Sequence, residues 1–360
     1  MPKKAAIQKN SAALFSILEL YGIYTGFASH NSIHDIWWLP VPEMGRPHAI
    51  LSFPRGTGLC EKTQPMLRLE DLLKIAESHS GDLATQVASF DIGDRHFDFN
   101  SNPHLMGVVN LSPDSWYNES VCLSTEKAVE KGLALRTQGA ALVDLGAESS
   151  LLDAARADGA LQESRLIPVV SELSSHDVTV SVETYLPSVA RASLEAGAKM
   201  VNVTGSGESS EIYRMAAEHG AAVIICYVQG KNVRSVGHRD LSADQIPILE
   251  EYFEREIQHA ANVGLEKIIV DPGLGFYYRN LQDSQKRIRH QIEVFLNTFR
   301  LRKLGWPVCH ALPHASEIFQ EEVRCAEPFF AVLAALGKTS LFRTHEVLRT
   351  KAVLETLGVY

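Results

Sequence analysis

The chain has 360 residues, of which 45% are hydrophobic and 21% charged, a composition that is ordinary for a globular protein. A chain of this length buries enough surface on folding to need neither disulfides nor a metal for stability, and it has no apolar run long enough for a transmembrane helix. The formal net charge of −9 argues against nucleic acid or an anionic membrane surface as a main partner, although a local basic pocket for a small anion stays open.

Residues 1–85 carry no catalytic motif, and we expect an accessory segment rich in α-helix, of unknown function. Its first residues superficially resemble a signal peptide, but Glu19 interrupts the apolar patch and no small-residue cleavage site follows. The chain's five cysteines are scattered, odd in number and lack a Cys-x-x-Cys pair, which indicates free thiols in a reducing compartment. The sequence therefore predicts a cytoplasmic protein.

The stretch "VASFDIGDRHFDFN" (87–100) has alternating apolar residues on both sides of an Ile-Gly-Asp-Arg turn, which predicts a β-hairpin. From residue 104 onward, short apolar runs alternate with helical segments. The apolar runs are 104–112, 141–147, 179–185, 200–206, 221–228, 267–273, 306–313 and 340–346. The helical segments are 125–139, 163–176, 186–197, 209–220, 243–263, 280–304, 325–337 and 347–358. Several of the helices are expected to stop at a glycine, namely Gly139, Gly197, Gly220, Gly264 and Gly305.

The apolar runs suit strands that are buried on both faces of a parallel sheet. Eight strand–helix units match an α/β fold of the (β/α)8 type, the TIM barrel. We therefore expect residues 86–360 to form this barrel, with the hairpin as a plug at its bottom. The alternative is a doubly wound open sheet, which usually carries a Gly-x-Gly-x-x-Gly turn that this sequence lacks.

Polar side chains gather where six of the eight predicted strands end. In a TIM barrel the active site lies at the carboxyl ends of the strands. A single acid or amide there is as often the cap of the next helix, but the same pattern on six strands favours a site. The residues concerned are Asn110, Ser112, Asp114 and Ser115, then Asp144 and Glu148, Glu183, Asn202, Asp271, and finally Arg343 and His345.

These residue types favour a pocket for a flat heterocycle beside a site for an anion. Buried carboxylates need a partner, and the N–H groups of a guanidine-like ring edge would supply one. Arg343 and His345 lie on one side of their strand, and such a cationic pair suits a phosphate or diphosphate. Asn110 and Asp144 offer oxygen ligands, which suit Mg²⁺ better than zinc.

Five motifs of the chain resemble those of the dihydropteroate synthase family, over about residues 87–360. They are Asn110-Leu-Ser-Pro-Asp-Ser-Trp, Asp144-Leu-Gly-Ala-Glu-Ser-Ser, Ser181-Val-Glu-Thr, Val270-Asp-Pro-Gly-Leu-Gly-Phe and Arg343-x-His345. The resemblance implies a pterin-binding barrel that acts in folate biosynthesis. Such a transferase joins a dihydropterin methyl diphosphate to p-aminobenzoate and releases diphosphate.

The resemblance also implies roles for individual residues. Glu183, Asn202 and Asp271 would hold the pterin, and Asp114 and Ser115 belong to the loop that would lie over it. In a separate group, the diphosphate would be held by Arg343 and His345 and by a Mg²⁺ ion on Asn110, while Asp144 would order the loop and the metal region. Small molecules are thus the expected partners, with no nucleic acid or membrane, and a homodimer is left open.

Two positively charged residues of the family are missing from this sequence. Their absence leaves more than one hypothesis about the activity. The lysine at the end of the family's seventh strand corresponds to Ala315, and an arginine after the second strand corresponds to Leu151. His310, His314 or Lys338 could replace one charge. The first hypothesis is a working, divergent synthase. The second is a non-catalytic pterin-binding homologue that acts as a partner or regulatory protein. A pterin-dependent methyl transfer protein fits less well, because the Arg-x-His pair suits diphosphate departure.

Overall fold

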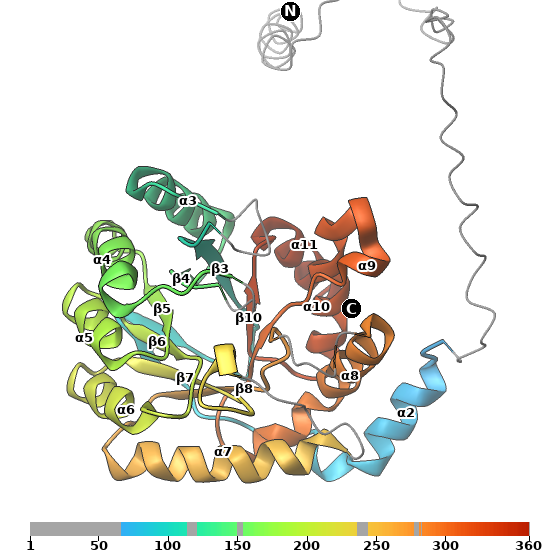
Figure 1. The fold of residues 1–360 in the computed structure, drawn as a ribbon. Helices are drawn as coiled ribbons and strands as arrows, with labels where there is room; N and C mark the ends of the chain where they lie inside the picture. The colour runs from blue at the N-terminus through green and yellow to red at the C-terminus, as the bar shows by residue number, and fades with distance from the viewer. Residues whose placement is uncertain are drawn as a thin grey trace, which may run out of the picture. The chain divides into compact units, whose positions relative to one another are not determined.

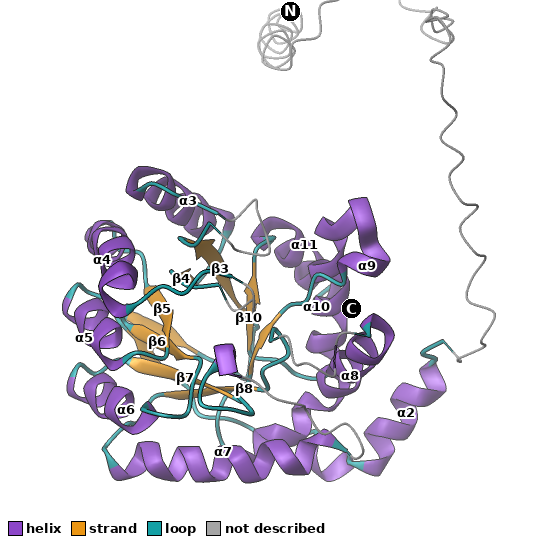
Figure 2. Cartoon of the chain, in the orientation of Figure 1, coloured by secondary structure: helices purple, strands orange, loops and turns teal. Residues whose placement is uncertain are grey.

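The computed structural model describes residues 66–113, 121–149, 154–235, 244–276, 281 and 283–359 (Figure 1). Strands and helices alternate along most of this length (Figure 2). The strands are β1 (Phe90–Ile92), β2 (Arg95–Phe97), β3 (His104–Asn110), β4 (Leu142–Gly146), β5 (Val180–Thr184), β6 (Met200–Val203), β7 (Ala222–Cys226), β8 (Ile268–Asp271), β9 (Cys309–Ala311) and β10 (Leu341–Thr344). The α-helices are α2 (Leu69–Ser78), α3 (Thr125–Gln138), α4 (Gly159–Ser175), α5 (Pro187–Glu195), α6 (Ser209–Glu218), α7 (Gln245–Asn262), α8 (Ser284–Asn297), α9 (Ser316–Phe319), α10 (Ala326–Leu336) and α11 (Val347–Leu357). Short 3₁₀ helices are Ser80–Asp82, Val233–Ser235, Thr298–Leu304 and Gln320–Cys325.

Strands β3 to β10 form one eight-stranded parallel sheet in the order β8-β7-β6-β5-β4-β3-β10-β9. The two ends of this sheet meet, because the amide of Val270 in β8 donates to the carbonyl of Pro307, just before β9, at 3.0 Å. Helices surround the strands (Figure 1). The fold is therefore the predicted (β/α)8 barrel, and all eight predicted strands and the helices between them are confirmed.

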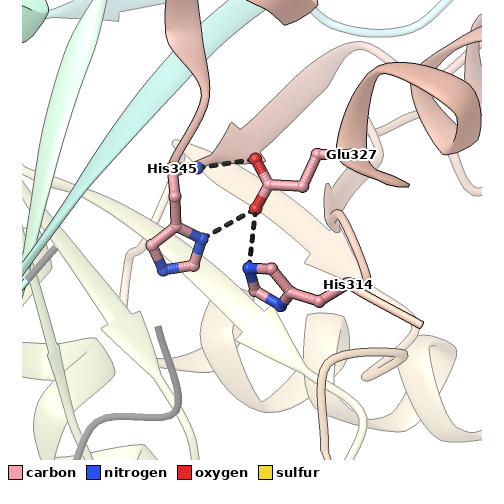
Figure 3. A group of neighbouring side chains, drawn as sticks. All are labelled: His314, Glu327 and His345. Atoms are coloured by element: carbon pink, nitrogen blue, oxygen red, sulfur yellow. Dashed lines mark hydrogen bonds and ion pairs between the residues drawn. The ribbon is translucent and has the colours of Figure 1, made fainter. Parts of the chain in front are cut away.

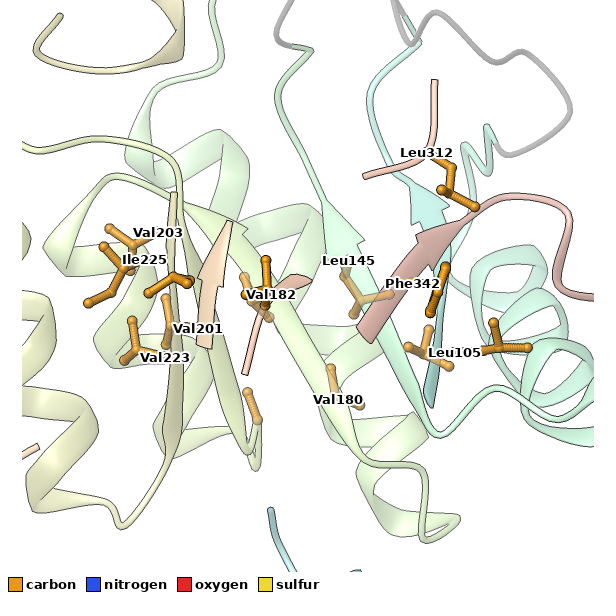
Figure 4. Close-up of a cluster of buried hydrophobic side chains, with 14 of the residues drawn as sticks. Leu105, Leu145, Val180, Val182, Val201, Val203, Val223, Ile225, Leu312 and Phe342 are labelled. Atoms are coloured by element: carbon orange, nitrogen blue, oxygen red, sulfur yellow. The ribbon is translucent and has the colours of Figure 1, made fainter. Parts of the chain in front are cut away.

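The period-two pattern of the strands divides the core into two layers. Residues that point outward pack under the helices, and those labelled in Figure 4 lie on neighbouring strands and in the loop after β9. They are Leu105, Leu145, Val180, Val182, Val201, Val203, Val223, Ile225, Leu312 and Phe342. Both faces of these strands are thus covered, as the unbroken apolar runs require.

The hairpin β1–β2 closes the bottom of the barrel, as predicted. Ile92 and Phe97 of the hairpin and Phe99 just after it are fully or almost fully buried, and they join one cluster with the first inward residues of the strands. Leu142, Met200 and Leu341 are examples of these strand residues. Apolar side chains therefore fill the amino-terminal half of the barrel, and its polar inward residues lie above them.

The five glycines predicted to stop helices all adopt positive φ angles, from 62° at Gly220 to 114° at Gly197. Helix α2 lies in the segment that we expect to be rich in α-helix, and its Leu72 and Ile75 pack against the outer core layer. The accessory role assigned to residues 1–85 stays a prediction, because residues 1–65 lie outside the described residues. Within the described part of the chain, every helix is too short or too polar to cross a membrane.

Candidate active site

A cavity of about 130 Å³ opens at the carboxyl ends of the barrel strands. Its wall combines polar side chains from the strands with residues of the loops that follow β8 and β9. The polar side chains on strand ends are Asn110, Glu183, Asn202, Asp271 and Arg343, and His345, Glu148, Ser149, Thr204 and His314 follow in the loops. Within the described residues, polar side chains at the strand ends thus do surround one cavity.

Arg343 occupies the centre of this polar set and is held by two carboxylates. Its Nε lies 2.7 Å from Oδ2 of Asp144, and its Nη2 lies 2.6 Å from Oε2 of Glu183. Burial disfavours the charge of Arg343, but the two carboxylates outweigh it and raise the arginine's pKa well above the ordinary value. From the sequence, we expect the guanidine-like edge of a ligand to lie beside buried carboxylates. In the structure the guanidinium of Arg343 itself contacts two such carboxylates.

Asp144 is fully buried below the cavity wall, so it positions other groups and does not face the cavity itself. The hydroxyl of Ser181 donates to its Oδ1 at 2.6 Å, and Nδ2 of Asn202 donates to its Oδ2 at 3.2 Å. The thiol of Cys226 in turn donates to Oδ1 of Asn202 at 3.2 Å. Neighbouring strands β4 to β7 are thus joined by one chain of side-chain hydrogen bonds, which fixes the rotamer of Asn202 at the cavity.

Burial alters the acidity of two carboxylates that line the cavity. Desolvation raises the pKa of Glu183 to about 7; Arg343 opposes this rise, and the nearby carboxylates of Asp144, Asp271 and Glu148 add to it. Desolvation also raises the pKa of Asp271 to about 6, although the amide of Gly273 donates to its Oδ1 at 2.7 Å. Raised pKa values of this kind in a cavity favour a functional site.

His345 lines the cavity directly after β10 and contacts a buried carboxylate that the sequence did not single out. Its Nδ1 lies 2.7 Å from Oε1 of Glu327, and Nε2 of His314 lies 3.3 Å from the same oxygen (Figure 3). Glu327 is completely buried at the start of α10. Arg343 and His345 both line the cavity, and each already has a carboxylate partner. Burial lowers the pKa of His345, although Glu327 opposes this.

Of the three side chains considered as replacements for the missing lysine, only His314 reaches the cavity. His310 points outward instead, with its Nε2 2.8 Å from the hydroxyl of Thr298. Lys338 lies at the other end of the barrel and donates to the carbonyl of Leu83. Ala315 itself lines the cavity, so the position of the missing lysine does face the site.

The remaining predicted residues fall into two groups: those outside the described residues and those that line the cavity. Asp114 and Ser115, and also Leu151, lie outside the described residues. Asn110 lines the cavity. Glu148 lines it too, but both of its oxygens are engaged, by the Tyr185 hydroxyl at 2.6 Å and by the Ala157 amide at 3.2 Å.

Comparison with protein families gives the decisive match. The model of the family described as "Pterin binding enzyme" matches residues 106–335, which is well over half of the chain. The chain belongs to the pterin-binding enzyme family. The resemblance to dihydropteroate synthases noted from the motifs is thereby confirmed.

The relatives of this pterin-binding family member support the same conclusion. The chain is 29% identical to the dihydropteroate synthase of Mycobacterium leprae over 267 residues, which is 71% of this chain and 93% of that protein. It is 28% identical to the Escherichia coli K12 dihydropteroate synthase over 259 residues, 69% of this chain and 89% of that one. The structure of Xanthomonas albilineans dihydropteroate synthase with 4-aminobenzoic acid matches with a TM-score of 0.65 and 25% identity, over 76% of this chain and 98% of that one.

Proposed function

We propose that this chain is a divergent dihydropteroate synthase, which condenses a dihydropterin methyl diphosphate with p-aminobenzoate. The observation that carries the proposal is the group of Glu183, Asn202 and Asp271 on one wall of the cavity. Relatives of this chain are named dihydropteroate synthase. Structures of the Xanthomonas albilineans enzyme contain 4-aminobenzoic acid in one case, and indole-2-carboxylic acid with 6-chloroguanine in another.

The three side chains match the donors and acceptors of a pterin edge. When ionised, Glu183 and Asp271 are pure hydrogen-bond acceptors and would receive the N–H groups of the ring. Asn202 supplies both an amide donor and a carbonyl acceptor, and its hydrogen bonds to Asp144 and Cys226 keep the amide in a fixed orientation. A preorganised amide of this kind costs little reorganisation when the heterocycle binds.

In the proposed reaction, the C–O bond between the pterin methylene and the diphosphate breaks, and the amine nitrogen of p-aminobenzoate forms the new C–N bond. One proton leaves the amine, and the electron pair of the broken bond departs with the diphosphate. Arg343 and His345 would stabilise the negative charge that develops on the leaving oxygen. For this, Arg343 must turn from Glu183 towards the anion while it keeps its contact with Asp144.

The resemblance to the family implies a Mg²⁺ ion, and Asn110 could supply one protein ligand for it. Asn110 lines the cavity from the end of β3, and Mg²⁺ commonly binds through one or two protein oxygens together with substrate phosphates and waters. The ion would neutralise charge on the diphosphate when bound. Asn110 would hold this ion beside the polar wall.

A product assay tests the proposal. Purified protein is incubated with 7,8-dihydropterin methyl diphosphate, p-aminobenzoate and Mg²⁺, and dihydropteroate is measured by mass spectrometry. We expect product from the wild type and at least a tenfold lower rate from Asp271→Asn, because one charged hydrogen bond contributes about 1.5–3 kcal/mol. Absence of product at high protein concentration would overturn the proposal.

The second candidate function is binding of a pterin without catalysis. It is favoured by Ala315, which faces the cavity where the family carries a lysine, and by the two carboxylates that hold Arg343. Calorimetry with the dihydropterin alone separates the two candidates. Heat of binding without product formation would support the second candidate, and absence of both would sink both.

A further inference from the structure

We propose that His314, Glu327 and His345 form a binding site for a divalent transition-metal ion at the edge of the cavity. Two imidazole nitrogens and one carboxylate oxygen lie within 4.8 Å of one another, and both nitrogens are directed at the same oxygen of Glu327 (Figure 3). Two histidines and one glutamate are also a known ligand set of zinc sites that keep one coordination position open. The proposal does not depend on the transferase activity.

The two nitrogen–oxygen distances of the group are close to those of a tetrahedral site. Zinc bonds of about 2.0–2.1 Å place neighbouring ligand atoms about 3.3 Å apart. The gap between Nε2 of His314 and Oε1 of Glu327 already measures 3.3 Å. The gap between Nδ1 of His345 and the same oxygen measures 2.7 Å, so this ring must withdraw by only about half an ångström to admit the ion.

Glu327 is held in the orientation that a metal ligand needs. Its second oxygen, Oε2, accepts from the hydroxyl of Thr344 and from the amides of His345 and Glu346, the last two at 2.9 and 3.0 Å. Outer contacts of this type fix the direction of a coordinating carboxylate and raise metal affinity. Oε1 is therefore directed at both imidazole rings.

The open position of the ion would face the cavity, because His314 and His345 line it while Glu327 is buried behind them. A metal there would add a positive charge to the cavity, in which the two arginines that the structure describes are already paired with carboxylates. Arg343 is matched by two carboxylates, and Nη2 of Arg287 lies 2.5 Å from Oε1 of Glu317. The open position would thus bind an anionic oxygen, and none of the three ligands is Asn110, the residue proposed to hold Mg²⁺.

The test is Co²⁺ and Zn²⁺ binding to the full chain after removal of bound metals with a chelator. We expect visible d–d absorption bands of low-coordinate Co²⁺, which Zn²⁺ abolishes in equimolar amounts and which inorganic diphosphate shifts. His314→Ala and Glu327→Gln should each weaken Zn²⁺ binding by more than about 100-fold, because losing a ligand exceeds the 10–100-fold effect of losing an outer contact. Mg²⁺ should not compete.

His176→Ala is the matched control, since His176 is an exposed histidine that also lies near a glutamate, Glu172. It should keep the wild-type Zn²⁺ affinity and Co²⁺ spectrum. Glu327→Gln removes a buried anchor of the fold, so circular dichroism accompanies each variant, and His314→Ala at the cavity edge decides the question if Glu327→Gln does not fold. Absence of the Co²⁺ bands, or bands and affinity that survive His314→Ala, would overturn the proposal.

Discussion

Glu183→Asp is expected to release Arg343 from one of its two carboxylates and to tighten the binding of inorganic diphosphate. In the present geometry Oε2 of Glu183 lies 2.6 Å from Nη2 of Arg343. Removing one methylene withdraws the carboxylate by about 1.5 Å, the length of one C–C bond. The contact then exceeds hydrogen-bond reach, and the guanidinium can turn towards an anion.

The size of this effect follows from the lost contact. A hydrogen bond between charged groups contributes about 1.5–3 kcal/mol. The low end applies here, because the two side chains are 14% and 17% exposed and Arg343 keeps its contact with Asp144. Since about 1.4 kcal/mol corresponds to a factor of ten in affinity, we expect the dissociation constant of diphosphate to fall about tenfold.

Isothermal calorimetry with diphosphate measures this change directly. Glu148→Asp is the matched control, because Glu148 also lines the cavity but bonds to Tyr185 and Ala157 instead of Arg343. This control should leave diphosphate affinity unchanged. A folded Glu183→Asp variant that binds diphosphate no more tightly than the wild type would refute the view that Glu183 restrains Arg343.

Three further predictions concern stability and pH. Asp144→Ala should lower the free energy of unfolding by about 3–5 kcal/mol, because it leaves Arg343 short of a buried partner; a loss below 1 kcal/mol in urea denaturation would contradict the ion pair. Gly337→Ala should lower the free energy of unfolding by at least about 1–3 kcal/mol, because the new Cβ would lie 1.7 Å from the carbonyl oxygen of Phe295. Gly81→Ala is the control and should leave the free energy of unfolding unchanged, because its new Cβ has nothing within 4 Å. Dihydropterin affinity should rise from acidic pH to pH 8, because Glu183 and Asp271, with pKa values of about 7 and 6, become pure acceptors only when they lose their protons; a flat calorimetric pH profile would count against both as ligands.

The barrel could be predicted because its signals are local. Each strand is a short apolar run, and helices end at glycines such as Gly139 and Gly305, whose left-handed conformations follow from the absence of a side chain. The position of the polar cavity also follows from the sequence, since parallel strands bring Asn202 and Asp271 to the same end of the barrel.

The pairing of charges within the cavity could not be predicted, because it depends on rotamers and on residues far apart in the chain. Arg343 and Asp144 are 199 residues apart, and the sequence alone does not say which carboxylates the arginine contacts. Glu327 was missed because it lies in a helix and not at a strand end. The sequence does contain an indication of it, because Glu327 is the one acid in the otherwise apolar helix "AEPFFAVLAAL". A carboxylate buried in such a helix needs partners.

A single-turnover experiment tests the central claim most directly. Protein in excess is mixed with 7,8-dihydropterin methyl diphosphate, p-aminobenzoate and Mg²⁺, and both products are quantified over time. The account predicts that dihydropteroate and diphosphate appear in equal amounts, and that Asn202→Ala slows both equally because the pterin loses its fixed amide contact. A wild-type protein that binds the pterin diphosphate and returns it unchanged would contradict the assignment of a transferase.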